Sequence, residues 1–227
     1  MTSIFLVGPM GSGKSTVGRA LARKINFRFI DSDREIEARC GVDIPTIFEY
    51  EGEKGFRDRE ERIIDELSAL PGIVLATGGG SVLRESSRER LMNRGCVILL
   101  QVDIKEQLRR VAFDANRPLL QTDDPEARLR SLMQEREPIY KAVAHLHVST
   151  DSRRMHHVVS RILRLLQQRQ ICLKIPTSEP SECREPTQSQ EPQEPQEPQN
   201  SQESQELSNP QEAREPQELS EIQDIRK

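Results

Sequence analysis

The chain has 227 residues and a formal net charge of −4, but its charge is unevenly distributed. From Pro176 onward Glu, Gln, Ser and Pro dominate, with thirteen acidic and four basic residues, so residues 1–175 carry a net charge of +5. This mildly basic segment suits a small anionic substrate and is far too weakly charged to indicate a nucleic-acid-binding protein. No stretch approaches the ~20 apolar residues of a membrane span, and the four cysteines have neither metal-binding nor C-x-x-C spacing. We therefore expect a soluble, cytoplasmic protein with reduced thiols that binds neither nucleic acid nor membrane.

The composition also predicts how the chain is divided. Residues 1–175 are numerous enough for one domain with a well-buried core. Residues 176–227 repeat Gln-Glu-Pro and have too few apolar side chains to offset the entropy lost on ordering, so we expect a disordered acidic tail.

Within residues 1–175, short apolar runs alternate with helical patterns. Buried strands are predicted at residues 4–7, 27–30, 73–76, 96–102 and 146–148, with helices between them and after the last. One of these helices is expected over residues 126–136, ending before Pro138. Strands that alternate with helices predict an α/β fold with a five-stranded parallel sheet flanked by helices on both faces.

The segment from Gly8 to Ser15, Gly-Pro-Met-Gly-Ser-Gly-Lys-Ser, fits the phosphate-binding pattern G-x-x-x-x-G-K-[ST]. An apolar run precedes it and a helical pattern follows, which is the order that the motif requires. Its glycines let successive N–H groups turn inward as an anion-binding nest at a helix N-terminus. Lys14 can then reach the β- and γ-phosphates of a nucleoside triphosphate, and the Ser15 hydroxyl is a ligand for Mg²⁺.

Two more segments directly follow predicted strands: Asp31 to Asp33, and the triple glycine Gly78 to Gly80. We therefore expect these two segments and the glycine loop at the carboxyl edge of the sheet, where such folds bind ligands. Asp33 is the candidate to orient or deprotonate an acceptor hydroxyl, with helix capping as the alternative. Asp31 is expected to point to the other side and to hold the metal through water. Gly78, Gly79 and Gly80 are expected either to let a ligand approach the backbone closely or to adopt positive φ angles, since consecutive glycines carry an entropic cost.

Arg57 has Glu60 and Glu61 three and four residues later. Two interpretations are open: a solvated ion pair on a helix surface, or a guanidinium that a carboxylate holds in place so that it can grip an anionic substrate.

Two more arginines, Arg117 and Arg136, are considered as candidates for binding phosphate or substrate. Arg117 lies in a loop over residues 114–125 that is long enough for a lid, and it is expected to cover the phosphates. Arg136 is expected at the end of a helix, where basic residues are common for other reasons, so its position alone assigns it no role.

Together these residues resemble the shikimate kinase family. The matching segments are Gly8–Thr16, Asp31–Asp33, Gly55–Arg57 with Glu60, Ala76–Gly80, Arg117–Leu120 and Arg136–Tyr140. The resemblance extends over roughly residues 3–168 and is specific in combination, although the glycine loop alone is not. The tail is the one departure from the family pattern.

The resemblance implies a P-loop kinase fold and the ATP-dependent phosphorylation of the 3-hydroxyl of shikimate, a step toward chorismate and the aromatic amino acids. It implies that Asp33, Lys14 and Arg117 are catalytic, and that shikimate is bound by Asp33, Arg57, Gly79 and Arg136. It further implies one Mg²⁺ ion at Ser15, a monomeric enzyme, and a substrate lobe over residues 33–60 whose pocket Phe48 and Phe56 line. ATP is expected to contact Gly11, Ser12, Gly13, Lys14, Ser15, Thr16, Arg117 and, near the adenine, Arg153.

Two other kinds of function agree less well with the sequence. The nearest alternative among enzymes is a related small-molecule kinase, for gluconate or a nucleoside monophosphate. Two substrate-side arginines and a triple glycine favour a small carboxylate over a nucleotide. A nucleotide-dependent switch or scaffold is disfavoured because no guanine-reading N-K-x-D sequence occurs and because the donor and acceptor residues are both complete.

Overall fold

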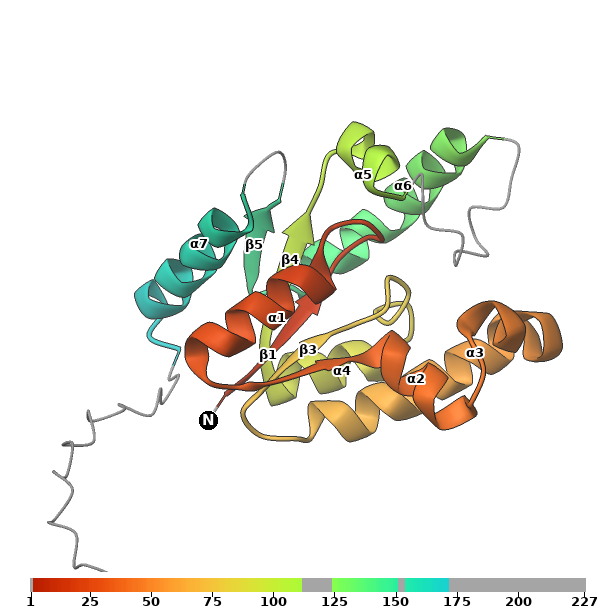
Figure 1. Ribbon diagram of the computed structural model, residues 1–227, viewed down its shortest axis with the longest axis horizontal. Coiled ribbons are helices and arrows are strands. Elements are labelled where there is room, and N and C mark those ends of the chain that lie inside the picture. Colours follow the sequence, from red (N-terminus) through yellow and green to blue (C-terminus); the bar gives the residue numbers. More distant parts are fainter. Residues whose placement is uncertain (1, 112–123, 151–153, 172–227) are drawn as a thin grey trace, which may run out of the picture. The chain divides into compact units, whose positions relative to one another are not determined.

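A five-stranded parallel sheet organises the residues that the computed structural model describes, which are 2–111, 124–150 and 154–171. The strands lie in the order β2-β3-β1-β4-β5, and every neighbouring pair is parallel (Figure 1). Their bounds are β1 (Ser3–Val7), β2 (Arg28–Asp31), β3 (Ile73–Ala76), β4 (Gly95–Gln101) and β5 (Leu146–Ser149). The predicted α/β class and all five predicted strands are confirmed.

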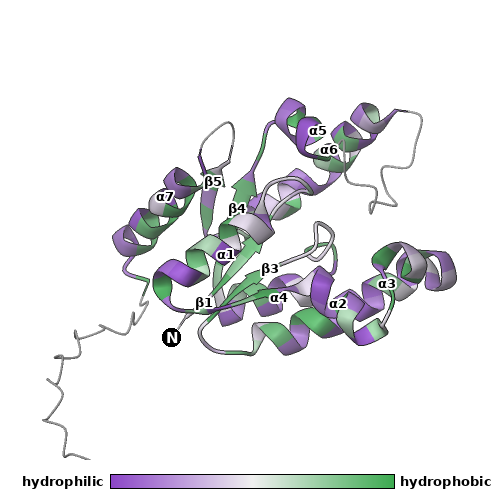
Figure 2. Cartoon of the chain, viewed as in Figure 1, coloured by the Kyte–Doolittle hydropathy of each residue, from purple (hydrophilic) through white to green (hydrophobic). Residues whose placement is uncertain are grey.

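Helices cover both faces of this sheet, as parallel strands require. They are α1 (Lys14–Ile25), α2 (Ser32–Cys40), α3 (Ile44–Ser68), α4 (Glu85–Arg94), α5 (Ile104–Val111), α6 (Pro125–Val143) and α7 (Met155–Gln168). Alternate residues of β1 serve the two faces: Ile4 and Leu6 pack with α1 and α7, whereas Phe5 and Val7 pack with α3, α4 and α6. Figure 2 shows the result, with apolar strands at the centre and polar helix surfaces outside. No helix among the described residues is both long and apolar enough to span a membrane.

The start of α2 differs from the prediction. Capping was the alternative role for Asp33, but Asp31 is the N-cap, and its Oδ1 accepts hydrogen bonds from the backbone N–H of Asp33 at 3.1 Å and of Arg34 at 3.5 Å. The reason is that β2 extends through Asp31, so this is the last residue with extended backbone and its carboxylate reaches the unpaired N–H groups of the first turn. The Asp33 side chain is therefore not committed to capping.

The prediction that a helix ends before Pro138 is wrong. Helix α6 continues through Pro138 to Val143. A proline inside a helix removes one backbone hydrogen bond, but Tyr140 and Val143 beyond it are each 1 % exposed, and this burial keeps the last turns helical. As a result Arg136 lies in the interior of the helix and not at its end.

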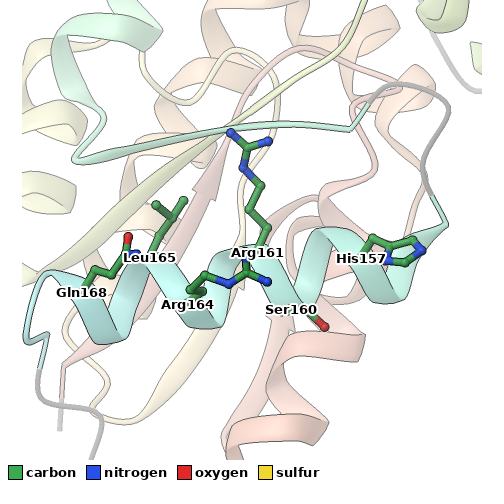
Figure 3. A pocket seen from close by; sticks show the side chains of 6 residues that line it. All are labelled: His157, Ser160, Arg161, Arg164, Leu165 and Gln168. Atoms are coloured by element: carbon green, nitrogen blue, oxygen red, sulfur yellow. The ribbon is translucent and has the colours of Figure 1, made fainter.

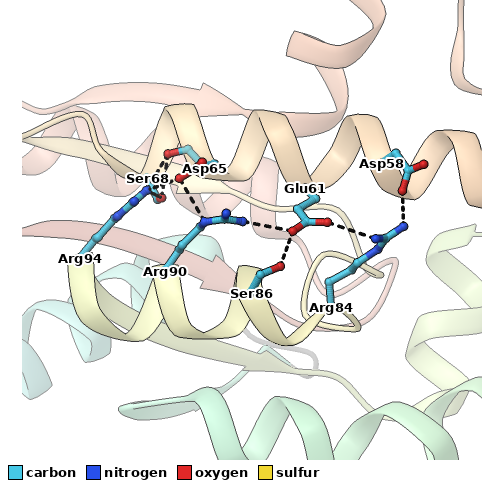
Figure 4. Close-up of polar contacts among 8 residues, drawn as sticks. All are labelled: Asp58, Glu61, Asp65, Ser68, Arg84, Ser86, Arg90 and Arg94. Atoms are coloured by element: carbon cyan, nitrogen blue, oxygen red, sulfur yellow. Dashed lines mark hydrogen bonds and ion pairs between the residues drawn. The ribbon is translucent and has the colours of Figure 1, made fainter.

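Ion pairs hold α4 against α3 (Figure 4). They join Arg84, Arg90 and Arg94 to the α3 carboxylates Asp58, Glu61 and Asp65. Each pair is partly exposed and contributes little alone, but several along one helix face restrict how α3 can rotate. Restricting α3 matters because its neighbouring face carries Arg57 and Glu60.

Candidate functional site

The segments predicted to meet at the carboxyl edge of the sheet do meet there. A single hollow is lined by residues that follow β1, β2 and β3, together with one arginine from α5: Met10, Gly11, Gly13, Lys14, Ser15, Thr16, Asp31, Asp33, Thr77, Gly79 and Arg110. Because the strands are parallel, their carboxyl ends share one edge, and residues as far apart in the chain as Met10 and Arg110 line the same hollow.

The first wall of the hollow is the loop between β1 and α1. Gly8, Gly11 and Gly13 have φ angles of 139°, 71° and 86°, a region that favours glycine. The N-cap of α1 is Gly13, which offers no side-chain acceptor to the N–H groups of the first turn. The Lys14 ammonium donates to the carbonyls of Gly8 at 2.8 Å and Pro9 at 2.9 Å, so its positive charge lies over the loop. This geometry suits a chain of phosphates.

Beside the loop, the Ser15 hydroxyl donates to Asp31 Oδ2 at 2.6 Å. A hydroxyl and a carboxylate oxygen in contact are hard donors of the kind that Mg²⁺ prefers, usually with several waters retained. The pair therefore fits the predicted metal. The expectation that Asp31 points away from Asp33 is wrong, since both line the same hollow. Strand alternation ends at Asp31 because helix α2 begins at the next residue.

On the acceptor side, Arg57 and Glu60 form a buried ion pair. Arg57 is 8 % and Glu60 3 % exposed, and Arg57 Nη1 donates to Glu60 Oε2 at 2.6 Å. Burial by itself lowers the pKa of the Arg57 guanidinium, but the charge and hydrogen bond of Glu60 outweigh it and raise the pKa. The interpretation as a solvated pair is thus wrong, and the guanidinium is held in place by a carboxylate. Glu61 faces α4 instead.

The triple glycine is explained by close packing of protein side chains. None of the three has a positive φ angle. A Cβ at Gly78 would come within 2.6 Å of Asp33 Oδ1 and would overlap Glu60, and a Cβ at Gly80 would overlap the Arg57 guanidinium. At Gly79 the nearest atom would be 3.6 Å away, an ordinary van der Waals contact, and this glycine lines the hollow. Gly78 and Gly80 therefore let Asp33, Glu60 and Arg57 converge.

Arg136 and Tyr140 of α6 complete this side. The Tyr140 hydroxyl donates to the Gly79 carbonyl. Burial raises the pKa of the Tyr140 phenol to about 12, although the positive charge of Arg136 opposes the rise. Arg136 is 6 % exposed. Among the described residues, neither its Nε nor that of Arg57 has a hydrogen-bond partner, so two buried arginines retain unused N–H donors.

Other predicted site residues are either absent from the described lining of the hollow or lie outside the described residues. Phe48 and Phe56 stack on each other with ring centroids 4.7 Å apart, and Phe56 is 4 % exposed in the core, so neither is among the described lining residues of the hollow. Arg117 and Arg153 lie outside the described residues, as do the tail and residues 114–123 of the predicted lid. Of that loop, Asp124 caps α6 and Pro125 is its first residue.

Sequence reasoning missed the contribution of α5. Arg110 lines the hollow and donates to the carbonyl of Gly11 at 3.1 Å, while Gln107 donates to the carbonyl of Met10 at 3.0 Å. Nearly one hundred residues separate donor and acceptor. No local pattern marks such contacts, because they depend on where the chain returns after β4.

Figure 3 shows a second hollow, along the exposed side of α7. Its described lining residues all belong to this one helix: His157, Ser160, Arg161, Arg164, Leu165 and Gln168. They include no carboxylate and no strand end, so this hollow lacks the chemistry of the first. His156 and His157 are both exposed.

Comparisons with known proteins agree with this geometry. A family model described as shikimate kinase matches residues 10–167. A shikimate kinase from Pseudomonas putida is 55 % identical over 168 residues, which is 74 % of this chain and 98 % of the relative. One from Halorhodospira halophila is 56 % identical over 164 residues, covering 72 % and 93 % of the two chains.

Solved structures lead to the same family. A shikimate kinase from Acinetobacter baumannii, in complex with shikimate, superposes with a TM-score of 0.74 at 45 % identity, covering 76 % of this chain and 96 % of the other. A shikimate kinase from Bacteroides thetaiotaomicron gives a TM-score of 0.68 at 31 % identity, with 73 % and 98 % covered.

Proposed function

The chain belongs to the shikimate kinase family, and we propose that it transfers the γ-phosphate of ATP to the 3-hydroxyl of shikimate, a reaction on the route to the aromatic amino acids. One observation carries this proposal. The phosphate-binding loop lines one hollow together with Asp33 and Gly79. The glycines on either side of Gly79 pack against Asp33, Glu60 and the buried Arg57.

The donor half of the reaction uses the loop after β1. Backbone N–H groups of Gly11 to Thr16 bind the phosphates, and the Lys14 ammonium turns from the loop carbonyls toward the β- and γ-phosphates. Ser15, whose hydroxyl is hydrogen-bonded to Asp31, would hold Mg²⁺. When bound, this ion neutralises charge on the phosphate oxygens.

The acceptor half uses the two arginines. Shikimate carries one carboxylate, and a guanidinium binds a carboxylate through two parallel hydrogen bonds. Arg57 is already oriented by Glu60, and Arg136 is buried beside Tyr140. Together they fix the carboxylate end of the substrate, while Gly79, which lines the hollow, lies beside the ring. The positive charges of the two arginines favour shikimate, which has a carboxylate, over an uncharged sugar.

Asp33 performs the proton chemistry. Its carboxylate lies next to Gly78 at the start of α2, and it accepts a hydrogen bond from the 3-hydroxyl and takes the proton as the oxygen attacks phosphorus. Most of the rate enhancement comes from positioning and charge stabilisation, as in other phosphoryl transfers. Arg117 is assigned as the residue that covers the phosphates.

The proposal includes the organisation of the chain. Residues 1–175 form the kinase domain, with a substrate lobe over 33–60 and a lid over 114–125, and residues 176–227 are an acidic tail. Both halves of the site come from one chain, which supports a monomer. Cys40 and Cys96 are free thiols, which agrees with work in the reducing cytoplasm.

The test is a coupled assay of ADP formation by the purified full chain with ATP, Mg²⁺ and increasing shikimate. We expect saturable, shikimate-dependent ADP release, with quinate or gluconate as matched controls of similar size. ADP release that does not respond to shikimate would refute the proposal.

A further inference from the structure

Gln107 is a buried polar residue that the proposed reaction does not yet use. It lies on α5 and is 2 % exposed. Its Nε2 donates to the Met10 carbonyl at 3.0 Å, which also fixes the orientation of the amide, because a carbonyl can accept only from the NH₂ end. A buried amide carries a desolvation cost unless it is hydrogen-bonded, so its placement against the loop after β1 is specific.

Holding the Met10 carbonyl affects the opposite side of the loop. In an anion-binding nest the N–H groups point inward, and the intervening carbonyls must point outward. Gln107 captures one such carbonyl, and Arg110 captures the next, that of Gly11. The packing is tight as well, since a Cβ on Gly11 would lie 3.0 Å from Val111 Cγ1 and 3.4 Å from the Gln107 carbonyl. Helix α5 therefore acts as the outer support of the loop.

Gln107 also shares a small cavity with Arg136 of the acceptor half. Gln107 Oε1 is buried and has no hydrogen-bond partner among the described residues, and Arg136 Nε is in the same condition. Both residues line one small cavity between α5, α6 and the loop, with room for about one water molecule. An unpaired acceptor and an unpaired donor at a cavity of this size are the arrangement that a bound water satisfies.

We propose that Gln107 is a positioning residue that links the two halves of the site. Its NH₂ group holds the phosphate-binding loop through Met10, and its Oε1 connects, through one bound water, to the Nε of Arg136. This inference rests on the proposed function only in assigning Arg136 to shikimate. The role toward the loop concerns nucleotide binding and stands separately.

The first test is the affinity of the full chain for ADP with Mg²⁺, measured by isothermal titration calorimetry. Gln107→Met keeps the length of the side chain and removes both polar ends, so the Met10 carbonyl loses its donor. We expect ADP binding about tenfold weaker, from the loss of one buried hydrogen bond. Gln107→Glu should weaken it further, because a carboxylate brings an acceptor and a negative charge next to the loop. Wild-type ADP affinity in both variants would overturn the proposal.

Ser68→Ala is the matched control. Ser68 is also 2 % exposed and bridges Asp65 and Arg94 at the far end of α3. It should lower the melting temperature without changing ADP affinity. An equal loss of ADP affinity in this variant would mean that general destabilisation, and not loop support, causes the effect in Gln107→Met.

The second test addresses the link to Arg136. In the wild type, shikimate should change the dissociation constant of ADP, and ADP should change that of shikimate by the same factor. In Gln107→Met, the ratio of the ADP dissociation constants without and with shikimate should fall toward 1. A factor of 1 in the wild type would refute the link while leaving the loop role intact. Because ADP binding needs no turnover, a chain that binds ADP but does not phosphorylate shikimate would disprove the function without disproving the loop role.

Discussion

The two carboxylates that bind Arg57 provide a controlled perturbation of the acceptor side. Glu60 is buried and accepts from Arg57 Nη1 at 2.6 Å and from the Ser81 hydroxyl at 2.8 Å. Glu53 accepts from the other terminal nitrogen at 3.1 Å, and its side chain is 55 % exposed. Glu60→Gln and Glu53→Gln make the same chemical change at the two ends of one guanidinium.

The expected magnitudes differ because of burial. Removing one partner of a buried ion pair costs roughly 3–5 kcal/mol. Glutamine keeps an oxygen that can still accept one hydrogen bond, so we expect Glu60→Gln to lower the free energy of unfolding by about 2–3 kcal/mol. Water screens the exposed pair, and Glu53→Gln should cost less than about 1 kcal/mol.

The same reasoning applies to substrate binding. Once Glu60 is neutral, Arg57 is free to move away from Gly80 and its grip on the shikimate carboxylate weakens. The loss of one well-aligned charge-assisted contact corresponds to an increase in KM for shikimate of about 10- to 100-fold. KM for ATP should stay within about twofold in both variants, because the phosphate loop does not contact Glu60.

Urea unfolding and steady-state kinetics on the same preparations test these numbers. Similar changes in Glu60→Gln and Glu53→Gln would refute the argument that burial makes Glu60 the partner that orients Arg57. An increase in KM for ATP as large as that for shikimate would show that the effect is not confined to the acceptor side.

Three further predictions concern other parts of the chain. Asp33→Asn should lower kcat by about 10²–10⁴-fold while ADP affinity stays near that of the wild type, and near-normal turnover would remove Asp33 from the proton chemistry. The Arg109 hydrogen bond lowers the pKa of Glu106 from 4.5 to about 2. The ionised form thus stabilises the fold above pH 4.5, and this contribution is lost as the pH falls toward 2, so the melting temperature of Glu106→Gln should decline less steeply with acid than that of the wild type. Deletion of residues 176–227 should leave kcat and melting temperature nearly unchanged, because this segment has few apolar residues to add to a core, and a large loss of either would contradict that.

The sequence alone was sufficient for the fold and for the location of the site. Continuous apolar runs such as residues 73–76 are typical of strands buried on both faces, and here each predicted strand is present. The glycine loop, the aspartates and the triple glycine were predicted to converge only because each follows a strand. Parallel strands bring such segments to one edge regardless of their distance in the chain, so this step needed no knowledge of side-chain packing.

Only the tertiary structure decided what individual side chains do at that edge. Burial made the Arg57–Glu60 pair an oriented guanidinium, whereas spacing alone left a solvated pair equally open. The last extended residue of β2 made Asp31, and not Asp33, the helix cap. Helix α6 continues past Pro138 because the side chains beyond it are buried. Gln107 contacts Met10 because the chain returns to the glycine loop after β4. These outcomes depend on which groups lose contact with water and on contacts between distant residues, and neither is encoded in a local pattern.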